Sequence, residues 1–358
     1  MTTAKSYKII NTGICILRLW MCLEVVMNHC YVSANDFFVV NWLHPVFGRA
    51  AVPIFFIISF YYLDPEALSE HTDRFKSRLL RLVIPQVTWG GIYWIIVYVV
   101  DKIWNLYQDE VTPFDLIAQI FTGSVAILNP VMWFQVDLII ATVLVFSLYK
   151  IKSNAKGRLL SFLFIVCFVV QYTGINYDIF QDCGYELIPV ARLAEIIPYC
   201  IAGLFLAKNS EKNGIETIRG HKKIENRFLK GKWIYILLCA AMVIAFILLY
   251  DTDDNVVDFG YSGIPLLFFS VILFVLFRNT KSRIQSVRLK KMIYGLGKST
   301  ETVYFSHILI RNVIAVFFDI GSIKGVGSFW ICISIMSIGI ASHFILFFLK
   351  NCVRGYFK

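Results

Sequence analysis

The sequence predicts an all-α membrane protein, a polytopic bundle of about ten transmembrane helices with the N-terminus and the C-terminus both on the inner side. Composition is the first observation behind this prediction. Hydrophobic residues make up 58% of the 358 residues and charged residues only 16%, whereas soluble domains carry about 25% charged residues. A soluble core of this length could not hide 31 Phe, 18 Tyr and 8 Trp, but helices that face lipid expose such side chains without cost.

The spacing of apolar runs is the second observation. A helix needs roughly 20 residues to cross a bilayer, and ten runs approach that length. They lie at about 9–32, 45–62, 79–100, 131–149, 158–174, 188–207, 232–250, 259–277, 299–318 and 327–349. Segment 113–128 is shorter and contains Pro113, Asp115 and Gly123, which favours an interfacial or re-entrant piece. Residues 1–358 are therefore expected to form one integral membrane domain with no appended soluble domain.

The distribution of charge is the third observation, and it predicts the orientation of the helices. Cytoplasmic loops are enriched in Lys and Arg. With the N-terminus inside, the inner segments hold all 34 Lys and Arg residues except Arg18, Arg49, Lys102, Arg192, Arg311 and Lys324. The outer loops carry Asp and Glu instead. The net charge of +10 is thus interpreted as the bias that orients the helices in the cytoplasmic membrane. The expected partner is the lipid bilayer, and binding of nucleic acid is not expected.

No metal site is predicted. The nine Cys residues form no CxxC or comparable pattern, and most lie within apolar runs, where Cys behaves as a small apolar residue. The sequence also shows no Gly-rich phosphate loop and no internal repeat.

The first expected span carries three ionisable residues, Arg18, Glu24 and His29. Ionisable groups inside a span are costly, so each is a candidate site residue. Arg18 and His29 are eleven residues apart, which is about three helical turns and places both on one face, roughly 16 Å apart along the axis. Glu24 lies on a different face and is expected to make a different contact. Arg18 and His29 either tie this helix to its neighbours or serve a function.

Three other expected spans also carry polar residues that share a helical face. In 299–318, Tyr304, His307 and Arg311 follow Glu301 at spacings of 3, 3 and 4, which indicates either an interhelical hydrogen-bond seam or a site. The remaining candidates are Arg192 and Glu195 in 188–207, and Trp133 and Asp137 in 131–149. Arg192 and Glu195 are three residues apart and are also placed to neutralise each other.

A basic stretch precedes the third expected span. It contains Arg74, Lys76, Arg78 and Arg81 and runs into Pro85. Basic residues beside a span fix its orientation, which accounts for the stretch without any ligand. The alternative is an anion clamp, because guanidinium groups suit phosphates.

Taken in order, these residues resemble the motifs of the acyltransferase-3 family of integral membrane O-acyltransferases. Arg18 and His29, with ten residues between them, resemble the first-helix motif of that family. Further resemblances are Gly48 to Tyr61 in the second span, Arg78 to Pro85 at the third, Trp133-Phe134 at the fourth, and Tyr304 to His307 in the ninth. One departure is Phe60, which stands where the family usually has Gly.

The resemblance implies transfer of an acyl group, usually acetyl, from acyl-coenzyme A to a hydroxyl of an envelope or capsular polysaccharide or lipid-linked sugar at the outer side of the membrane. It implies acyl-coenzyme A as co-substrate and no metal. His29 is then expected to be the general base, with Arg18 in the donor channel. Asp137 or Glu195 is expected to orient the His29 ring, and Arg192 or Arg311 to stabilise the oxyanion.

The other candidate residues are expected to bind the substrates of this reaction. Arg74, Lys76, Arg78 and Arg81 are expected to bind the donor, and Trp133, Tyr304 and His307 to line the pocket. The principal alternative is a transporter or flippase for an anionic or lipid-linked glycan, whose pathway polar faces would line equally well. Transporters often show two related halves, and no such symmetry is visible in the sequence. A glycan polymerase would usually carry a longer outer loop than 101–130.

Overall fold

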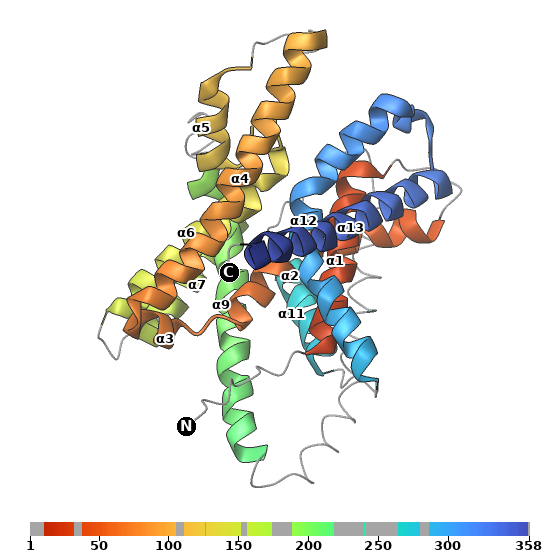
Figure 1. The fold of residues 1–358 in the computed structure, drawn as a ribbon. Coiled ribbons are helices and arrows are strands. Elements are labelled where there is room, and N and C mark those ends of the chain that lie inside the picture. Colours follow the sequence, from red (N-terminus) through yellow and green to blue (C-terminus); the bar gives the residue numbers. More distant parts are fainter. Residues whose placement is uncertain are drawn as a thin grey trace. The chain divides into compact units, whose positions relative to one another are not determined.

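The computed structural model describes residues 11–31, 38–104, 111–125, 127–151, 156–173, 188–217, 240, 264–279 and 286–356, and these contain helices and no strand (Figure 1). The helices are α1 (Thr12–Cys30), α2 (Phe38–Tyr61), α3 (Pro65–Glu70), α4 (Thr72–Trp104), α5 (Pro113–Thr122), α6 (Trp133–Lys150), α7 (Lys156–Thr173), α9 (Ile188–Thr217), α11 (Ile264–Asn279), α12 (Val287–Phe317) and α13 (Val326–Tyr356), with short 3-10 turns at Pro130–Met132 and Ile320–Ser322. The prediction of an all-α protein is confirmed for these residues.

Five of the described helices are long and apolar enough to cross a membrane. They contain Thr12–Cys30, Leu43–Tyr61, Thr72–Ile103, Pro130–Lys150 and Val326–Leu349. Shorter apolar helices occupy Gly157–Val170 and Pro265–Asn279. The expected spans at 188–207 and 299–318 are helical but are not among these five, and most of 232–250 lies outside the described residues. Ten spans, with both termini inside, stay a prediction.

The chain divides into two compact units. Unit 1 contains α1, α2 up to Phe55, α11 from Phe268, α12 and α13. Unit 2 contains the end of α2 from Phe56, and α3 to α7, together with α9 up to Glu216.

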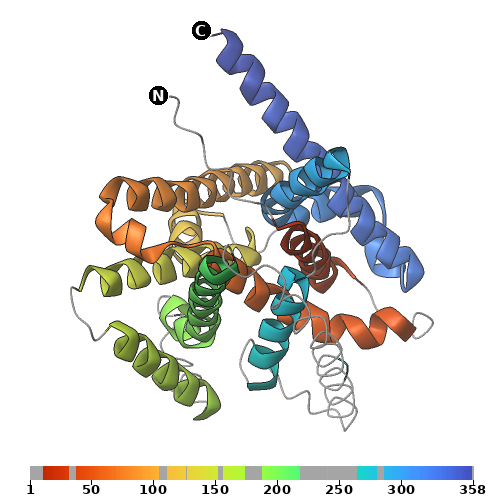
Figure 2. The same ribbon diagram turned by 90° about the horizontal axis from the view of Figure 1, so that it is seen from below.

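Helices α1, α12 and α13 form the centre of unit 1 and lie side by side in both views (Figures 1 and 2). From one contact between α1 and α12 to the next, the residue numbers increase in the same direction along both helices. Arg18 meets Thr300, and the ring of His29 meets the ring of His307. The two helices therefore run in the same direction, as expected for two odd-numbered spans.

Helices α11 and α13 of unit 1 run in the opposite direction to α1. Asn11, at the start of α1, donates to the carbonyl of Arg278 at the end of α11 (2.6 Å). Ser328, near the start of α13, donates to the carbonyl of Cys30 at the end of α1 (3.5 Å). Alternating direction is what consecutive spans 8, 9 and 10 of the predicted topology require.

In unit 2, α4 and α6 pack antiparallel. Phe75 stacks on Phe146 with ring centroids 3.7 Å apart, and seven residues later the carbonyl of Leu82 accepts from Gln135 at 2.9 Å. The predicted interfacial segment between them is the ten-residue helix α5, which is too short to span a bilayer and ends at Gly123 with a φ of 66°.

A buried amide network holds α5 and the turn after it against α4. Gln86 of α4 donates to the carbonyl of Gln119 at 3.0 Å. The Gln119 side chain in turn donates to the carbonyl of Asn129 (2.7 Å) and accepts from the backbone of Val125 (2.9 Å). These bonds fix the loop that follows Thr122.

Phe60, which departs from the family pattern, is fully buried within unit 2. It packs beside Gly203 of α9, where an added Cβ would lie 3.0 Å from the Cβ of Phe60 and 2.6 Å from the carbonyl oxygen of Ile57. The absence of a side chain at position 203 therefore makes room for the larger residue at position 60, so the departure is accommodated by packing.

Candidate active site

His29 lies at the last turn of α1, exposed on one side and in contact with α12 on the other. Its ring centroid is 5.5 Å from that of His307, with the ring planes inclined at 40°. Both residues belong to unit 1. Two candidates that the sequence placed on different helices thus meet as a histidine pair.

A pocket of about 270 Å³ opens beside His29. Its walls come from the end of α1, from α12 and from the turn before α13. The polar lining groups are His29, Tyr31, Arg311, Asn312 and Asp319. A pocket with a neutral base, a guanidinium, an amide and a carboxylate suits a polyhydroxylated ligand, because each group can hydrogen-bond a hydroxyl.

His307 lies behind His29 and is completely buried. Its Nδ1 is 2.6 Å from the carbonyl oxygen of Tyr304 and 3.3 Å from that of Val303. The ring of Tyr304 is 6.2 Å from the His307 ring, centroid to centroid. Tyr304 and His307 therefore sit together on α12, and His29 lies between His307 and the pocket.

Arg18 faces α12 near the other end of α1. Its Nη2 donates to the Thr300 hydroxyl at 3.1 Å, and Glu301 lies within electrostatic range. The Cys22 thiol also donates to the Thr300 carbonyl, at 3.7 Å. Arg18 and His29 thus both face α12, which agrees with their spacing of eleven residues.

Thr300 is the partner that the sequence analysis missed. It is buried, whereas Glu301, which the spacing had favoured, is exposed. Thr300 precedes His307 by seven residues, almost two full turns, so the two share a face more closely than Glu301 and His307 do. A heptad spacing from His307 could have identified it.

Glu24 makes contacts that differ from those of Arg18 and His29, as its position on a different face of α1 predicted. Its two carboxylate oxygens contact the Trp20 indole nitrogen (2.9 Å) and Nδ1 of His44 in α2 (2.7 Å). His44 was not singled out from the sequence. This pair ties α1 to α2 within unit 1.

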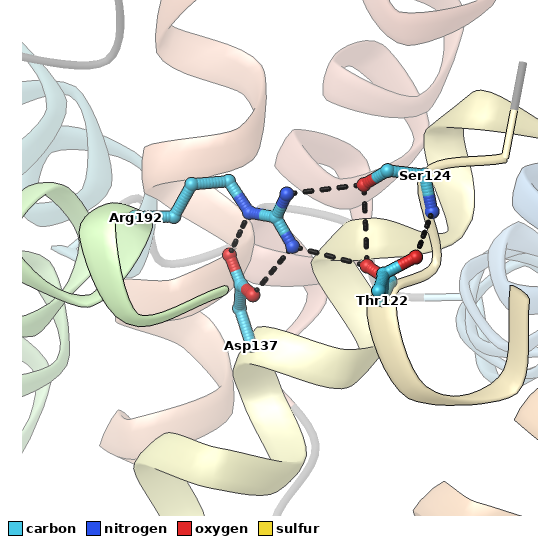
Figure 3. Close-up of polar contacts among 4 residues, drawn as sticks. All are labelled: Thr122, Ser124, Asp137 and Arg192. Atoms are coloured by element: carbon cyan, nitrogen blue, oxygen red, sulfur yellow. Dashed lines mark hydrogen bonds and ion pairs between the residues drawn. The ribbon is translucent and has the colours of Figure 1, made fainter. Parts of the chain in front are cut away.

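In unit 2, Arg192 of α9 joins α6 to the loop after α5 (Figure 3). Its Nε and Nη2 donate to the two carboxylate oxygens of Asp137 at 2.9 and 3.0 Å. It also donates to the Ser124 hydroxyl (3.0 Å) and the Thr122 carbonyl (3.1 Å). The guanidinium lies 5.2 Å from the centre of the Trp133 ring, at cation–π distance.

This network satisfies much of the hydrogen-bonding capacity of both charged groups. The Asp137 side chain is fully buried, and that of Arg192 is 14% exposed. Glu195, one turn along α9 from Arg192, is buried as well. The structure brings Trp133, Asp137 and Arg192 together in unit 2, whereas His29 and Arg311 belong to unit 1. The roles assigned to Asp137, Glu195 and Arg192 in the chemistry of His29 stay predictions.

The basic stretch of α4 presents its residues differently. Arg74, Arg78 and Arg81 fall on one helical face because their spacings are 4 and 3, whereas Lys76 lies nearly opposite. Arg74, Lys76 and Arg81 are exposed. Arg78 is half-buried, and its Nε and Nη2 atoms are buried without a hydrogen-bond partner in the described part of the chain.

Fold and site together define a class: a multi-pass membrane protein with an ionisable pocket at one end of its α1–α12 pair. A family model described as an acyltransferase domain matches residues 11–347. The chain therefore belongs to the acyltransferase-3 family, which confirms the resemblance and makes the protein an acyltransferase. Comparison with curated proteins and with solved structures gives no match. Within the described residues, no group of three His, Cys, Asp or Glu side chains could hold a metal ion.

Proposed function

We propose that this acyltransferase moves an acyl group, most often acetyl, from cytoplasmic acyl-coenzyme A to a hydroxyl of an envelope polysaccharide or lipid-linked sugar at the outer side of the cytoplasmic membrane. The observation that carries the proposal is the polar pocket beside His29, at the end of the helix that bears the family motif. With the N-terminus inside, this end of α1 faces outward, where a glycan acceptor arrives.

His29 is the general base in this proposal. A lone pair on its ring takes the proton of the acceptor hydroxyl while the oxygen attacks the thioester carbonyl carbon. The carbon–sulfur bond then breaks, and the imidazolium returns the proton to the departing thiolate, so that the products are an ester and coenzyme A. Histidine suits this exchange because it gains and loses a proton near neutral pH.

Arg311 is the proposed group that stabilises the oxyanion formed on the attacked carbonyl. It lines the same pocket as His29, and its guanidinium is exposed there. A fixed positive charge near developing negative charge lowers the barrier to reaction. Asn312 and Asp319 of the same pocket offer hydrogen bonds to the remaining hydroxyls of a sugar.

Arg78 supports the proposed donor site. A guanidinium with two buried nitrogen atoms that lack an acceptor is costly, so an anionic ligand that supplies oxygen atoms stabilises it. Thr142 of α6 also has a buried hydroxyl without a partner in the described residues. The antiparallel register set by Phe75–Phe146 and Leu82–Gln135 puts Thr142 at about the level of Arg78. Two unsatisfied groups at one level suit a phosphate of coenzyme A.

Replacing Arg78 with Gln is expected to weaken the binding of acetyl-coenzyme A by about tenfold or more, since a charge-assisted hydrogen bond contributes about 1.5–3 kcal/mol. Isothermal titration of the purified chain measures this affinity directly. Lys76→Gln is the matched control, because it removes the same charge from the opposite face of the same helix and should change affinity much less. Equal losses of affinity in the two variants would show that the basic stretch acts only through its overall positive charge and through fixing the orientation of the helix.

The function itself is tested on the host surface. Mass analysis of the surface glycans with and without the gene should show the loss of one acyl mass when the gene is deleted. Re-expression of the chain should restore the mass, and re-expression of a His29→Ala variant should not. Unchanged glycans in the deletion strain would contradict the proposed acceptor class.

A further inference from the structure

The buried imidazole of His307 is fixed in one tautomer by its own helix. Its Nδ1 lies 2.6 Å from the Tyr304 carbonyl oxygen and 3.3 Å from that of Val303. A carbonyl oxygen only accepts hydrogen bonds, so Nδ1 carries the proton and donates. In a neutral ring, Nε2 is then an acceptor with a free lone pair.

That lone pair has no donor among the residues that the structure describes. Nε2 of His307 is buried and makes no hydrogen bond within the described residues. An unsatisfied buried polar atom costs about 1–3 kcal/mol. A second proton on the ring would be more costly, because it would create a buried cation near Arg311 with an N–H group that lacks an acceptor.

His29 is the neighbouring group able to supply the missing hydrogen. The two ring centroids are 5.5 Å apart. An N–H···N bond of ordinary length between two imidazoles puts their centroids about 5 Å apart, so a small rotation of the exposed His29 ring is enough to form it. Arg311 is a second possible donor, but its side chain is exposed and lines the pocket.

We propose that His307 is the positioning residue of His29, and that its Nε2 accepts a hydrogen bond from one ring nitrogen of His29. This inference rests on the proposed function, in which His29 is the base. The bond leaves the lone pair on the other nitrogen of His29 free for the acceptor hydroxyl. When His29 takes the proton of that hydroxyl, the bond to His307 becomes charge-assisted and holds the imidazolium until the thiolate reclaims the proton.

In this arrangement a neutral histidine orients the catalytic base, a role that a carboxylate has in Ser-His-Asp triads. His307 itself cannot reach the substrate, because it is completely buried and is not part of the pocket wall. Its two nitrogens have separate tasks: Nδ1 anchors the ring to α12, and Nε2 selects the tautomer of His29.

Two substitutions separate those tasks. His307→Asn keeps an amide donor near the position of Nδ1 but has nothing at the position of Nε2. His307→Gln can place its carbonyl oxygen near Nε2 and loses the anchor. If His307 positions His29, the Asn variant should lose about 10- to 100-fold in kcat with little change in the KM for acetyl-coenzyme A, and the Gln variant should retain most activity. A merely structural role predicts the reverse order, which would overturn the proposal.

The assay uses the purified full chain, acetyl-coenzyme A, and an envelope fraction from a host that lacks the gene. A direct measurement accompanies it: nitrogen NMR of histidine-labelled protein in lipid nanodiscs. The expected result is a neutral His307 protonated on Nδ1, with an Nε2 resonance that shifts in the His29→Ala variant. A proton on Nε2, a doubly protonated ring, or no response to His29→Ala overturns the pair. This measurement needs no turnover, so absence of acyl transfer by the wild-type chain counts against the proposed function alone.

Discussion

Replacing His29 with Ala is expected to reduce acyl transfer by about 10²–10⁴-fold, because general-base assistance is typically worth that much in rate. The variant should insert and fold normally, since His29 is exposed at the last turn of α1. The interaction it loses is the proposed hydrogen bond to the buried Nε2 of His307. The affinity for acetyl-coenzyme A should also persist, because the proposed donor residues lie on α4. Steady-state transfer to the host glycan measures the loss.

His343→Ala is the matched control for this experiment. His343 belongs to α13 of the same unit, and its Nδ1 contacts the Thr302 hydroxyl at 2.9 Å, away from the pocket wall. The same substitution there should leave the transfer rate within about twofold of the wild type, as expected for a residue outside the reaction. Arg18→Ala should differ from both by weakening donor binding as well as turnover. Transfer by His29→Ala at a near wild-type rate would remove His29 from the catalytic role.

Replacing Arg192 with Ala is expected to destabilise the protein by about 3–5 kcal/mol, because it leaves the buried carboxylate of Asp137 without its paired cation. The Ser124 hydroxyl and the Thr122 carbonyl lose a donor at the same time, so the loop after α5 is released from α9. Thermal unfolding in detergent measures the change, with the exposure of buried thiols as the signal.

A double variant shows whether charge or packing is responsible. Arg192→Met combined with Asp137→Leu removes both charges and keeps apolar volume, and such a replacement of a buried pair is often neutral or stabilising. It should therefore recover most of the stability lost in Arg192→Ala. Arg74→Ala, on an exposed position of α4, should change the free energy of unfolding by no more than about 0.5 kcal/mol. An Arg192→Ala protein as stable as the wild type would show that Asp137 does not need its partner.

The sequence predicted the grouping of residues on each helix well. The spacing of eleven residues put Arg18 and His29 on one face, and both face α12. Periodicity works here because angular position around one helix depends only on residue number. The same reasoning separated Glu24 from that face, and its carboxylate contacts Trp20 and His44.

Partners across helices were predicted less well. Thr300 was missed as the residue that meets Arg18, and the pairing of His29 with His307 was not anticipated. Both carboxylate oxygens of Asp137 accept from Arg192, a pairing that the sequence did not predict, and the expected role of Asp137 or Glu195 in orienting His29 stays a prediction. A contact between two helices depends on their rotation, depth and crossing angle, and none of these follows from the periodicity of either helix alone.

The sequence by itself determined the class of this protein: its apolar composition requires lipid-facing helices, and the order of its motifs identifies the acyltransferase-3 family. Only the tertiary structure decided which polar groups meet. It brought His29 and His307 together beside a pocket and joined Arg192 to Asp137. It also left two guanidinium nitrogens of Arg78 and the hydroxyl of Thr142 buried without hydrogen-bond partners among the described residues. The physical reason is that hydrophobicity is a property of each segment, whereas a hydrogen bond requires two atoms from different segments within about 3 Å.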